Sequence, residues 1–397
     1  MTVYLADWLA LGVRWLHLIA GIAWIGASFY FVWLDDHLRP PLVRDDELAG
    51  ELWAVHGGGF YRAVKYRLAP PTLPPTLHWF YWEAYTTWLS GFALLCLLYF
   101  ARAEGYLIDP AVAPLSKTAA IAIAAGVLVV SWLLYDALCR SPLQRRSAAL
   151  ALVLTALFCA EAYALCHLFS GRGAFLLFGS SLGTLMVANV LFVIIPGQRE
   201  LVRAQREQRP LDPAPGLRGR QRSIHNTYLT LPVLFVMISN HYPMTFGARH
   251  NALVLIAMSV AGAGIRAWFV ARHRQRQWQP LAVTSAVAAV LALVAVIAAL
   301  APRTDSTRQT AFEPARIQLI VAQRCVPCHS QKPTLAGFPA APNGVVLETL
   351  NEVMQHLPQM QQQLATNAMP LGNLTGMTPA ERAMLLGFVE QAQRSQP

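Results

Sequence analysis

Two cysteines and a histidine near the C-terminal end of the chain form the pattern with the clearest chemistry. They stand in the stretch VAQRCVPCHSQ, residues 321–331, as Cys325, Cys328 and His329. Cys-x-x-Cys-His is the pattern that attaches a c-type haem covalently. In this interpretation the two thiols form thioethers with the porphyrin and the imidazole ligates the iron. A disulfide or a thioredoxin-like pair gives no reason for the adjacent histidine, so we predict haem c here.

A haem iron held by His329 needs a sixth ligand or an open site. The downstream stretch NAMPLGNLTGMT resembles the Met-Pro loop of class I cytochromes c and offers Met369 as that ligand. Met/His ligation raises the reduction potential and suits electron transfer. Met377 is an alternative that could instead be packing, since Met fills cores well, and His356 is a weaker rival.

The rest of the chain is unusually apolar. Hydrophobic residues make up 55% and charged residues only 13%, against about 25% charged in ordinary soluble domains. Apolar runs of about twenty residues suit a bilayer. The net charge of +10 comes from short loops between these runs, which fits membrane topology and excludes a nucleic-acid partner. The eight predicted spans are about 8–34, 78–101, 118–138, 147–169, 173–196, 226–243, 250–271 and 281–301.

These runs predict an all-α protein of two parts. Residues 1–302 form a polytopic eight-helix transmembrane bundle, 303–313 a polar linker, and 314–397 a small all-α class I cytochrome c domain. Within the last part, Thr378 and Glu381 form a capping-box pattern at the start of a C-terminal helix.

The basic residues predict the orientation of the bundle. The loops after spans one, three, five and seven hold eighteen Lys and Arg residues, and the loops after spans two, four and six hold four. Under the positive-inside rule the first set is cytoplasmic. Both termini and the tail then lie on the periplasmic side of a bacterial inner membrane, where haem c is assembled. The N-terminal MTVYLADW has no basic region that would make it a cleaved signal.

Ionisable residues within the spans are costly and therefore candidates for function. Toward the outer face, His17 with a partner such as His241 or His167 could ligate a membrane haem b, and Arg14 could pair with a haem propionate. Each histidine could equally be hydrogen-bonded between helices or lie at the lipid headgroups. A second group lies toward the cytoplasm and comprises His78, Glu83, His225, Asn226 and Arg266.

Two further motifs resemble hydrolase signatures. GSSLG, residues 179–183, matches a nucleophile elbow, and HGGG, residues 56–59, matches an oxyanion loop. The elbow needs a strand-to-helix turn, whereas 179–183 lies inside an apolar run, so we interpret it as a small-residue helix contact. The glycines of HGGG still allow a ligand to approach the backbone closely.

Four long stretches carry a resemblance to the membrane-bound bacterial urate oxidase family. They are WLHLIAGIAWIGASFYFVWLD, ELWAVHGGGFYRAVKY, LHWFYWEAYTTWLSGF and HNTYLTLPVLFVMISNHYP. That family joins an eight-span membrane domain to a C-terminal cytochrome c. The resemblance implies an oxidoreductase that converts urate to 5-hydroxyisourate, passes electrons to cytochrome c and then to a downstream respiratory acceptor, and releases no hydrogen peroxide.

The polar residues toward the cytoplasm fit that chemistry. Urate is a monoanion at neutral pH, so Arg266, His78, His225 and Asn226 could bind it. Glu83 is a candidate base for the attacking water. Because urate arises mainly in the cytoplasm, we expect the substrate there and an electron relay toward the outer face.

A different class remains open: a non-enzymatic electron-transfer subunit, or a haem- or copper-handling protein with a fused cytochrome. In that case Glu83 and Asn226 are hydrogen-bond partners between helices.

Overall fold

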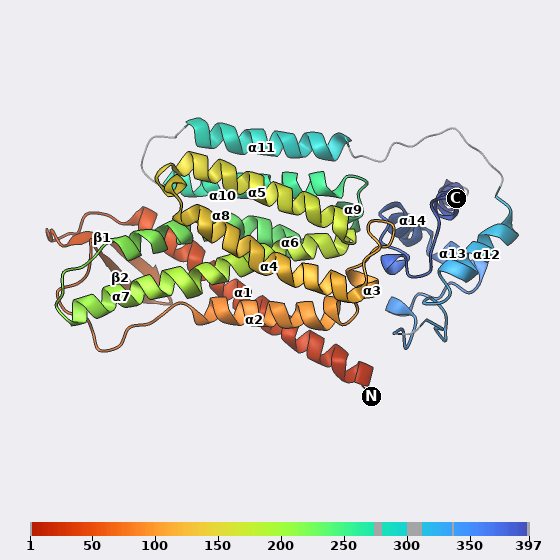
Figure 1. Cartoon of the computed structure of the whole chain (residues 1–397), viewed down its shortest axis with the longest axis horizontal. Coiled ribbons are helices and arrows are strands. Elements are labelled where there is room, and N and C mark those ends of the chain that lie inside the picture. The colour runs from red at the N-terminus through yellow and green to blue at the C-terminus, as the bar shows by residue number, and fades with distance from the viewer. Residues whose placement is uncertain (1, 274–279, 300–311, 336, 395–397) are drawn as a thin grey trace.

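The computed structural model describes residues 2–273, 280–299, 312–335 and 337–394. Its first part is a bundle of long helices that run side by side (Figure 1). The long helices are α1 (Thr2–His37), α2 (Trp82–Leu94) continued by η1 (Leu95–Phe100), α4 (Lys117–Arg140), α5 (Ser147–Leu168), α6 (Gly171–Asn189) continued by η3 (Val190–Ile194) and α7 (Ile195–Arg206), α8 (Ala214–Ser239), α10 (Asn251–His273) and α11 (Pro280–Ala299).

Each predicted span overlaps one of these helical segments. Five of them are long and apolar enough to cross a membrane: Trp8–His37, Lys117–Arg140, Ser147–Leu168, Gly171–Arg206 and Asn251–Val270. The membrane character of α2 with η1, of α8 and of α11 stays a prediction.

The outer surface of the bundle fits a lipid environment. On α1, Trp8, Trp15 and Ile22 expose 58%, 68% and 63% of their surface, and large exposed apolar patches mark membrane or partner surfaces. The core lies where α4, α5 and α6 pack, around the fully buried Tyr135 and Phe175.

A β-hairpin interrupts the helical pattern and corrects the all-α prediction. β1 (Leu48–His56) pairs antiparallel with β2 (Gly59–Tyr66). Gly57 and Gly58 have φ values of +58° and +80°, as a two-residue hairpin turn requires. The first two glycines of HGGG therefore form this turn, and no atom lies within 4 Å of their missing Cβ positions, whereas Gly59 begins β2.

The stretch GSSLG lies within α6, as predicted. A Cβ on Gly179 would lie 2.6 Å from Cγ1 of Val236 in α8, whereas a Cβ on Gly183 would meet nothing. The predicted small-residue contact is confirmed for the first glycine. It lets α8 lie close against α6.

The tail has its own apolar core, which includes Ile317, Leu357, Leu385 and Val389. The predicted capping box is confirmed. The backbone N–H of Thr378 donates to Oε2 of Glu381 at 2.7 Å, and the backbone N–H of Glu381 donates to Oγ1 of Thr378 at 3.2 Å. Most of the predicted linker lies outside the described residues. The tail elements are α12 (Pro314–Arg324), η4 (Pro342–Gly344), α13 (Leu350–Gln355), α14 (Leu357–Ala365), η5 (Leu371–Asn373) and α15 (Pro379–Arg394).

The tail lies at one end of the bundle, beside the short helices α3 (Ala103–Tyr106) and α9 (Pro243–Phe246) (Figure 1). The hairpin and α7 lie at the opposite end. A short 3-10 turn, η2 (Pro142–Arg145), joins α4 to α5.

Candidate functional site

The cysteine pair of the tail lies at the end of α12. Cys325 caps the helix, and its carbonyl oxygen accepts hydrogen bonds from the backbone N–H groups of Cys328, at 3.2 Å, and His329, at 2.9 Å. This turn brings the three residues together locally. Neither thiol forms a disulfide, so both remain available for thioether bonds.

The imidazole of His329 is oriented by a backbone group. Its Nδ1 lies 3.0 Å from the carbonyl oxygen of Val345, so the ring N–H on Nδ1 donates to that oxygen. This tautomer leaves Nε2 for a metal, and a second-shell bond of this kind is what metal-ligating histidines usually have. The donor set of the tail therefore fits haem c.

The structure separates the two methionines that could ligate the iron. Met377 is 4% exposed and belongs to the apolar core of the tail. Met369 is half-buried, and its carbonyl oxygen accepts a 2.7 Å hydrogen bond from Nη1 of Arg382. Packing accounts for Met377, which leaves Met369 as the better candidate. The rival His356 lies at the joint between α13 and α14.

A buried polar network joins three helices of the bundle. Nδ2 of Asn189 in α6 donates to Oδ1 of Asn226 in α8 at 2.9 Å and to the hydroxyl of Tyr135 in α4 at 3.1 Å. That hydroxyl lies 2.8 Å from Nδ1 of His225. Nδ2 of Asn226 donates to the backbone oxygen of Met186. His225 and Asn226, predicted together, are therefore held together.

An ion-pair cluster continues this network toward the end of α4. The carboxylate of Asp136 accepts from Nη2 of Arg222 at 2.7 Å and pairs with Nε of Arg140 at 2.6 Å. Arg222 is 3% exposed, and its guanidinium lies over the Tyr135 ring at 4.8 Å. Two positive charges thus share one carboxylate, which leaves a net positive site.

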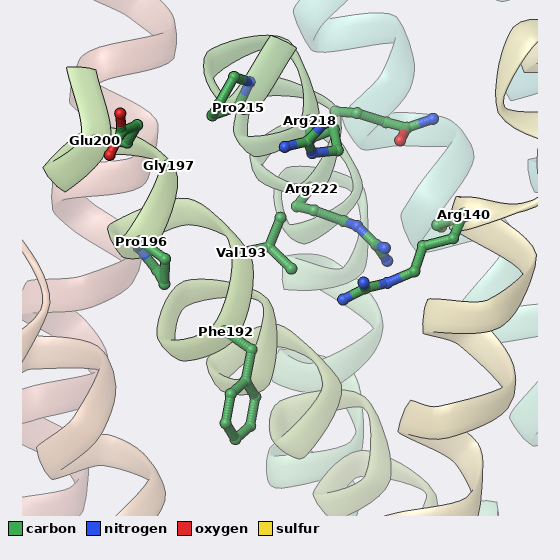
Figure 2. A pocket seen from close by; sticks show the side chains of 11 residues that line it. Arg140, Phe192, Val193, Pro196, Gly197, Glu200, Pro215, Arg218 and Arg222 are labelled. Atoms are coloured by element: carbon green, nitrogen blue, oxygen red, sulfur yellow. The ribbon is translucent and has the colours of Figure 1, made fainter. Parts of the chain in front are cut away.

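A cavity of about 310 Å³ opens beside this cluster, within the range of about 300–1,000 Å³ usual for small-molecule sites. Figure 2 shows the side chains of Arg140 and Arg222 directed toward each other at its wall. The cavity is lined by Cys139, Arg140, Phe192, Val193, Pro196, Gly197, Glu200, Pro215, Arg218, Gln221 and Arg222.

Nη1 of Arg222, which lines the cavity, is buried and has no hydrogen-bond partner within the described part of the chain. Deeper in the network, Oδ1 of Asn189 is also without a partner there, but Asn189 does not line the cavity. Buried polar atoms are normally paired. The unused donor of Arg222 is what an anionic ligand in the cavity can satisfy.

The other residues predicted for this group lie elsewhere. Arg266 of α10 stacks on the Phe29 ring of α1 at 3.8 Å, and two of its nitrogens have no hydrogen-bond partner among the described residues. His78 is exposed and contacts Phe80 with its ring. Glu83 lies in the first turn of α2, and no described hydrogen bond joins its carboxylate to the network.

Toward the other end of the bundle, His17 is wedged between α1 and α2. Its Nδ1 lies 2.9 Å from the Thr87 carbonyl oxygen and 3.2 Å from Oγ of Ser90. Arg14 is exposed.

The two partner histidines named from the sequence, His167 and His241, are both exposed, and Nδ1 of His167 is bonded to its own helix. These contacts carry no argument for a membrane haem b.

Sequence reasoning missed the residues that complete the buried network, namely Tyr135, Asp136, Asn189 and Arg222. The stretch YDALCR at the end of a predicted span carried a signal, because an aspartate so close to the apolar run is costly without a partner. Glu161 was also missed. Its carboxylate oxygens are buried inside the bundle beside Ser131 and Ser181.

Comparison with known protein families shows to which family the helical bundle is related. A family model described as urate oxidase N-terminal matches residues 3–299. The chain belongs to this family. Neither the curated proteins nor the solved structures gave a match. Membership in the urate oxidase N-terminal family supports an oxidoreductase function related to urate, and the matched range contains the whole cavity and its network.

Proposed function

We propose that the protein is a membrane-bound urate dehydrogenase that binds urate in the cavity between α4, η3 and α8. One observation carries the proposal. A member of the urate oxidase N-terminal family has a cavity lined by arginines, and Nη1 of Arg222 in its wall has no hydrogen-bond partner among the described residues. A urate monoanion offers the negative charge and the carbonyl oxygens that complement these arginines.

The reaction balances with water as the oxygen source. Urate and one water give 5-hydroxyisourate, two electrons and two protons. The chain must therefore hold the anion, accept a proton from the attacking water and take up the electrons.

The residues at the cavity divide these roles. Arg222 and Arg218 supply positive charge, and Arg222 is fixed by its ion pair with Asp136. In the tautomer that donates Nδ1–H to the Tyr135 hydroxyl, 2.8 Å away, His225 leaves Nε2 to accept a proton from water. We assign His225 the role of base, in place of Glu83, because only His225 is joined to the network beside the cavity.

The tail accepts the electrons in this proposal. A haem c held by Cys325, Cys328, His329 and Met369 supplies one-electron redox chemistry when bound, with a potential suited to electron transfer. The chain's own contribution is to fix the imidazole and the methionine-bearing loop. The proposal keeps the bundle in the bacterial inner membrane with both termini and the tail in the periplasm, and a respiratory acceptor receives the electrons.

The purified protein in detergent tests this function directly. Urate and ferricyanide are mixed without oxygen, and urate loss is followed together with ferricyanide reduction. We expect two ferricyanide reduced per urate consumed and, in air, no hydrogen peroxide.

Arg218→Gln removes a charge at the cavity, and Arg249→Gln removes one from an exposed site outside it. The first substitution should raise KM and the second should leave it unchanged. An equal KM in the two variants would show that urate does not bind in this cavity. An assembled, haem-replete protein that consumes no urate would favour an electron-transfer subunit.

A further inference from the structure

The tail contacts two short helices of the bundle, with backbone lying against backbone. η5 meets α3, and α14 meets α9. A Cβ on Gly372 would lie 2.8 Å from the carbonyl oxygen of Glu104, and a Cβ on Gly247 would overlap the carbonyl of Thr366. Both glycines thus permit an approach that a side chain would prevent. The contact is specific in shape.

The part of the contact that α3 makes is with the loop that carries Met369. Leu371 and Leu374 follow it directly, and their methyl carbons lie 3.7 and 3.5 Å from where a Cβ of Gly105 would stand. The loop that holds the proposed sixth ligand is therefore the part of the tail nearest to α3.

One arginine links the loop to both parts of the molecule. Nη1 of Arg382 donates to the carbonyl oxygens of Met369 and Leu364, at 2.7 and 3.1 Å. The same arginine interacts electrostatically with Asp109, which follows α3. Docking and the position of the Met369 backbone are thereby connected.

Aromatic side chains lie directly beneath the contact. The ring of Tyr106, the last residue of α3, lies 5.7 Å from that of the buried Tyr99. The Tyr99 hydroxyl donates to Oδ1 of Asn240 at 3.2 Å. Arg172 stacks on the rings of both Tyr106 and Phe246. This group leads from the contact into the bundle.

We propose that the contact of α3 with the Met369–Leu374 loop and of α9 with the end of α14 is a permanent docking surface through which electrons enter the tail, with Tyr106 and Tyr99 bridging it from below. The electron-entry role rests on the function proposed above. Each crossing would move one electron and no atom to a haem held by the tail, and both tyrosines keep their protons and act only as a bridge. Two crossings account for the two electrons that one urate loses.

The docked arrangement is tested by cysteine cross-linking in the full-length protein in its membrane. Gly105→Cys with Leu374→Cys places two thiols across the contact. Gly105→Cys with Leu319→Cys places the second thiol on the exposed face of α12 instead. We expect mild oxidant to cross-link the first pair and leave the second pair open. Equal cross-linking, or none in the first pair, would overturn the docking surface whatever the substrate is.

The route is tested by the rate at which urate reduces the haem. The cross-linked protein should be reduced at the wild-type rate, because no undocking is needed. Tyr106→Leu and Gly247→Leu should each slow reduction several-fold, with dithionite still reducing all the haem.

The outcomes of the rate test have distinct meanings. Loss of reduction on cross-linking, or an unchanged rate in both substituted variants, would overturn the route. A wild-type haem that urate never reduces would instead contradict the proposed function and leave the cross-linking result standing.

Discussion

At the scale of single residues, the charge of the cavity depends on Asp136. Its carboxylate pairs with the buried Arg222 and with Arg140, whose side chain is 64% exposed. Removing one partner of a buried pair leaves a charge uncompensated. The two arginines therefore offer a comparison between a buried and an exposed interaction with the same carboxylate.

We predict that Asp136→Asn lowers the free energy of unfolding by about 3–5 kcal/mol. Arg140→Gln should lower it by no more than about 1 kcal/mol, since exposed pairs contribute little. Thermal unfolding of both variants in detergent measures the difference. Similar losses would show that Arg222 does not depend on Asp136.

The identity of the base gives a second prediction. His225→Gln should lower kcat about 100-fold or more, the size expected for a lost general base. Glu83→Gln should leave kcat within a few-fold, because no described contact joins Glu83 to the network. Steady-state kinetics with haem-replete variants decide, and the reverse ranking would return the role of base to Glu83.

The local arrangement of the tail residues follows from their spacing in the sequence, whereas haem c there stays a prediction. Cys325, Cys328 and His329 lie within one turn, and the Thr378–Glu381 capping box spans four residues. The network of the bundle could not be predicted in the same way. Tyr135 contacts His225, 90 positions along the chain, and Asn189 contacts Tyr135 across 54 positions. A single sequence gives no distance between such residues.

At the scale of elements, the close approach of α6 and α8 positions the network, since α6 supplies Asn189 and α8 supplies Asn226. We predict that Gly179→Ala destabilises the protein by about 1–3 kcal/mol, because the new methyl group overpacks against Val236. Gly183→Ala, in open space on the same helix, is the matched control.

The double variant Gly179→Ala/Val236→Ala should regain part of the loss, since the two sites are in contact. The unfolding temperature of each of the three variants, compared with that of the wild type, measures its loss of stability. A loss from Gly183→Ala as large as that from Gly179→Ala would point to helix propensity in place of the contact.

The N-terminus of α15 gives a pH-dependent prediction. Hydrogen bonds from the Arg324 side chain, followed by the backbone N–H of Thr378, hold the pKa of Glu381 below its usual value of 4.5. A lowered pKa in the folded state stabilises the fold fully above that usual value and loses the effect as the pH falls through the lowered pKa.

Acid unfolding of the full-length protein, followed through the haem absorption, should therefore begin at higher pH in Glu381→Gln than in the wild type. The variant should also be less stable at neutral pH, where the wild type keeps the whole contribution. Coincident acid transitions with equal neutral stability would contradict this role of Glu381.

The sequence predicted the positions of the long helices because apolar runs of this length leave few alternatives. It did not predict the hairpin β1–β2, whose residues are largely exposed and carry only a weak alternation. Nor did it predict that Glu51 is 2% exposed there, paired with Arg62 at 2.6 Å. Burial of that carboxylate depends on strand pairing, which hydropathy does not report.

At the scale of the whole molecule, the cavity and the tail lie toward opposite ends of the bundle (Figure 1). The cavity end carries the arginine-rich segments around α7 and the start of α8, and the tail docks at α3 and α9. In the proposed orientation, urate is oxidised at the cytoplasmic end and the electrons leave at the periplasmic end. One chain would therefore carry both urate oxidation at the cavity and electron transfer to the tail.

The most direct test of this connection is anaerobic addition of urate to the oxidised, haem-replete protein while its visible spectrum is recorded. The account predicts that the haem c bands change to the reduced form, with two haems reduced per urate consumed. Arg218→Gln should need more urate for the same rate. A spectrum that stays oxidised with urate, yet is reduced by dithionite, would contradict the account.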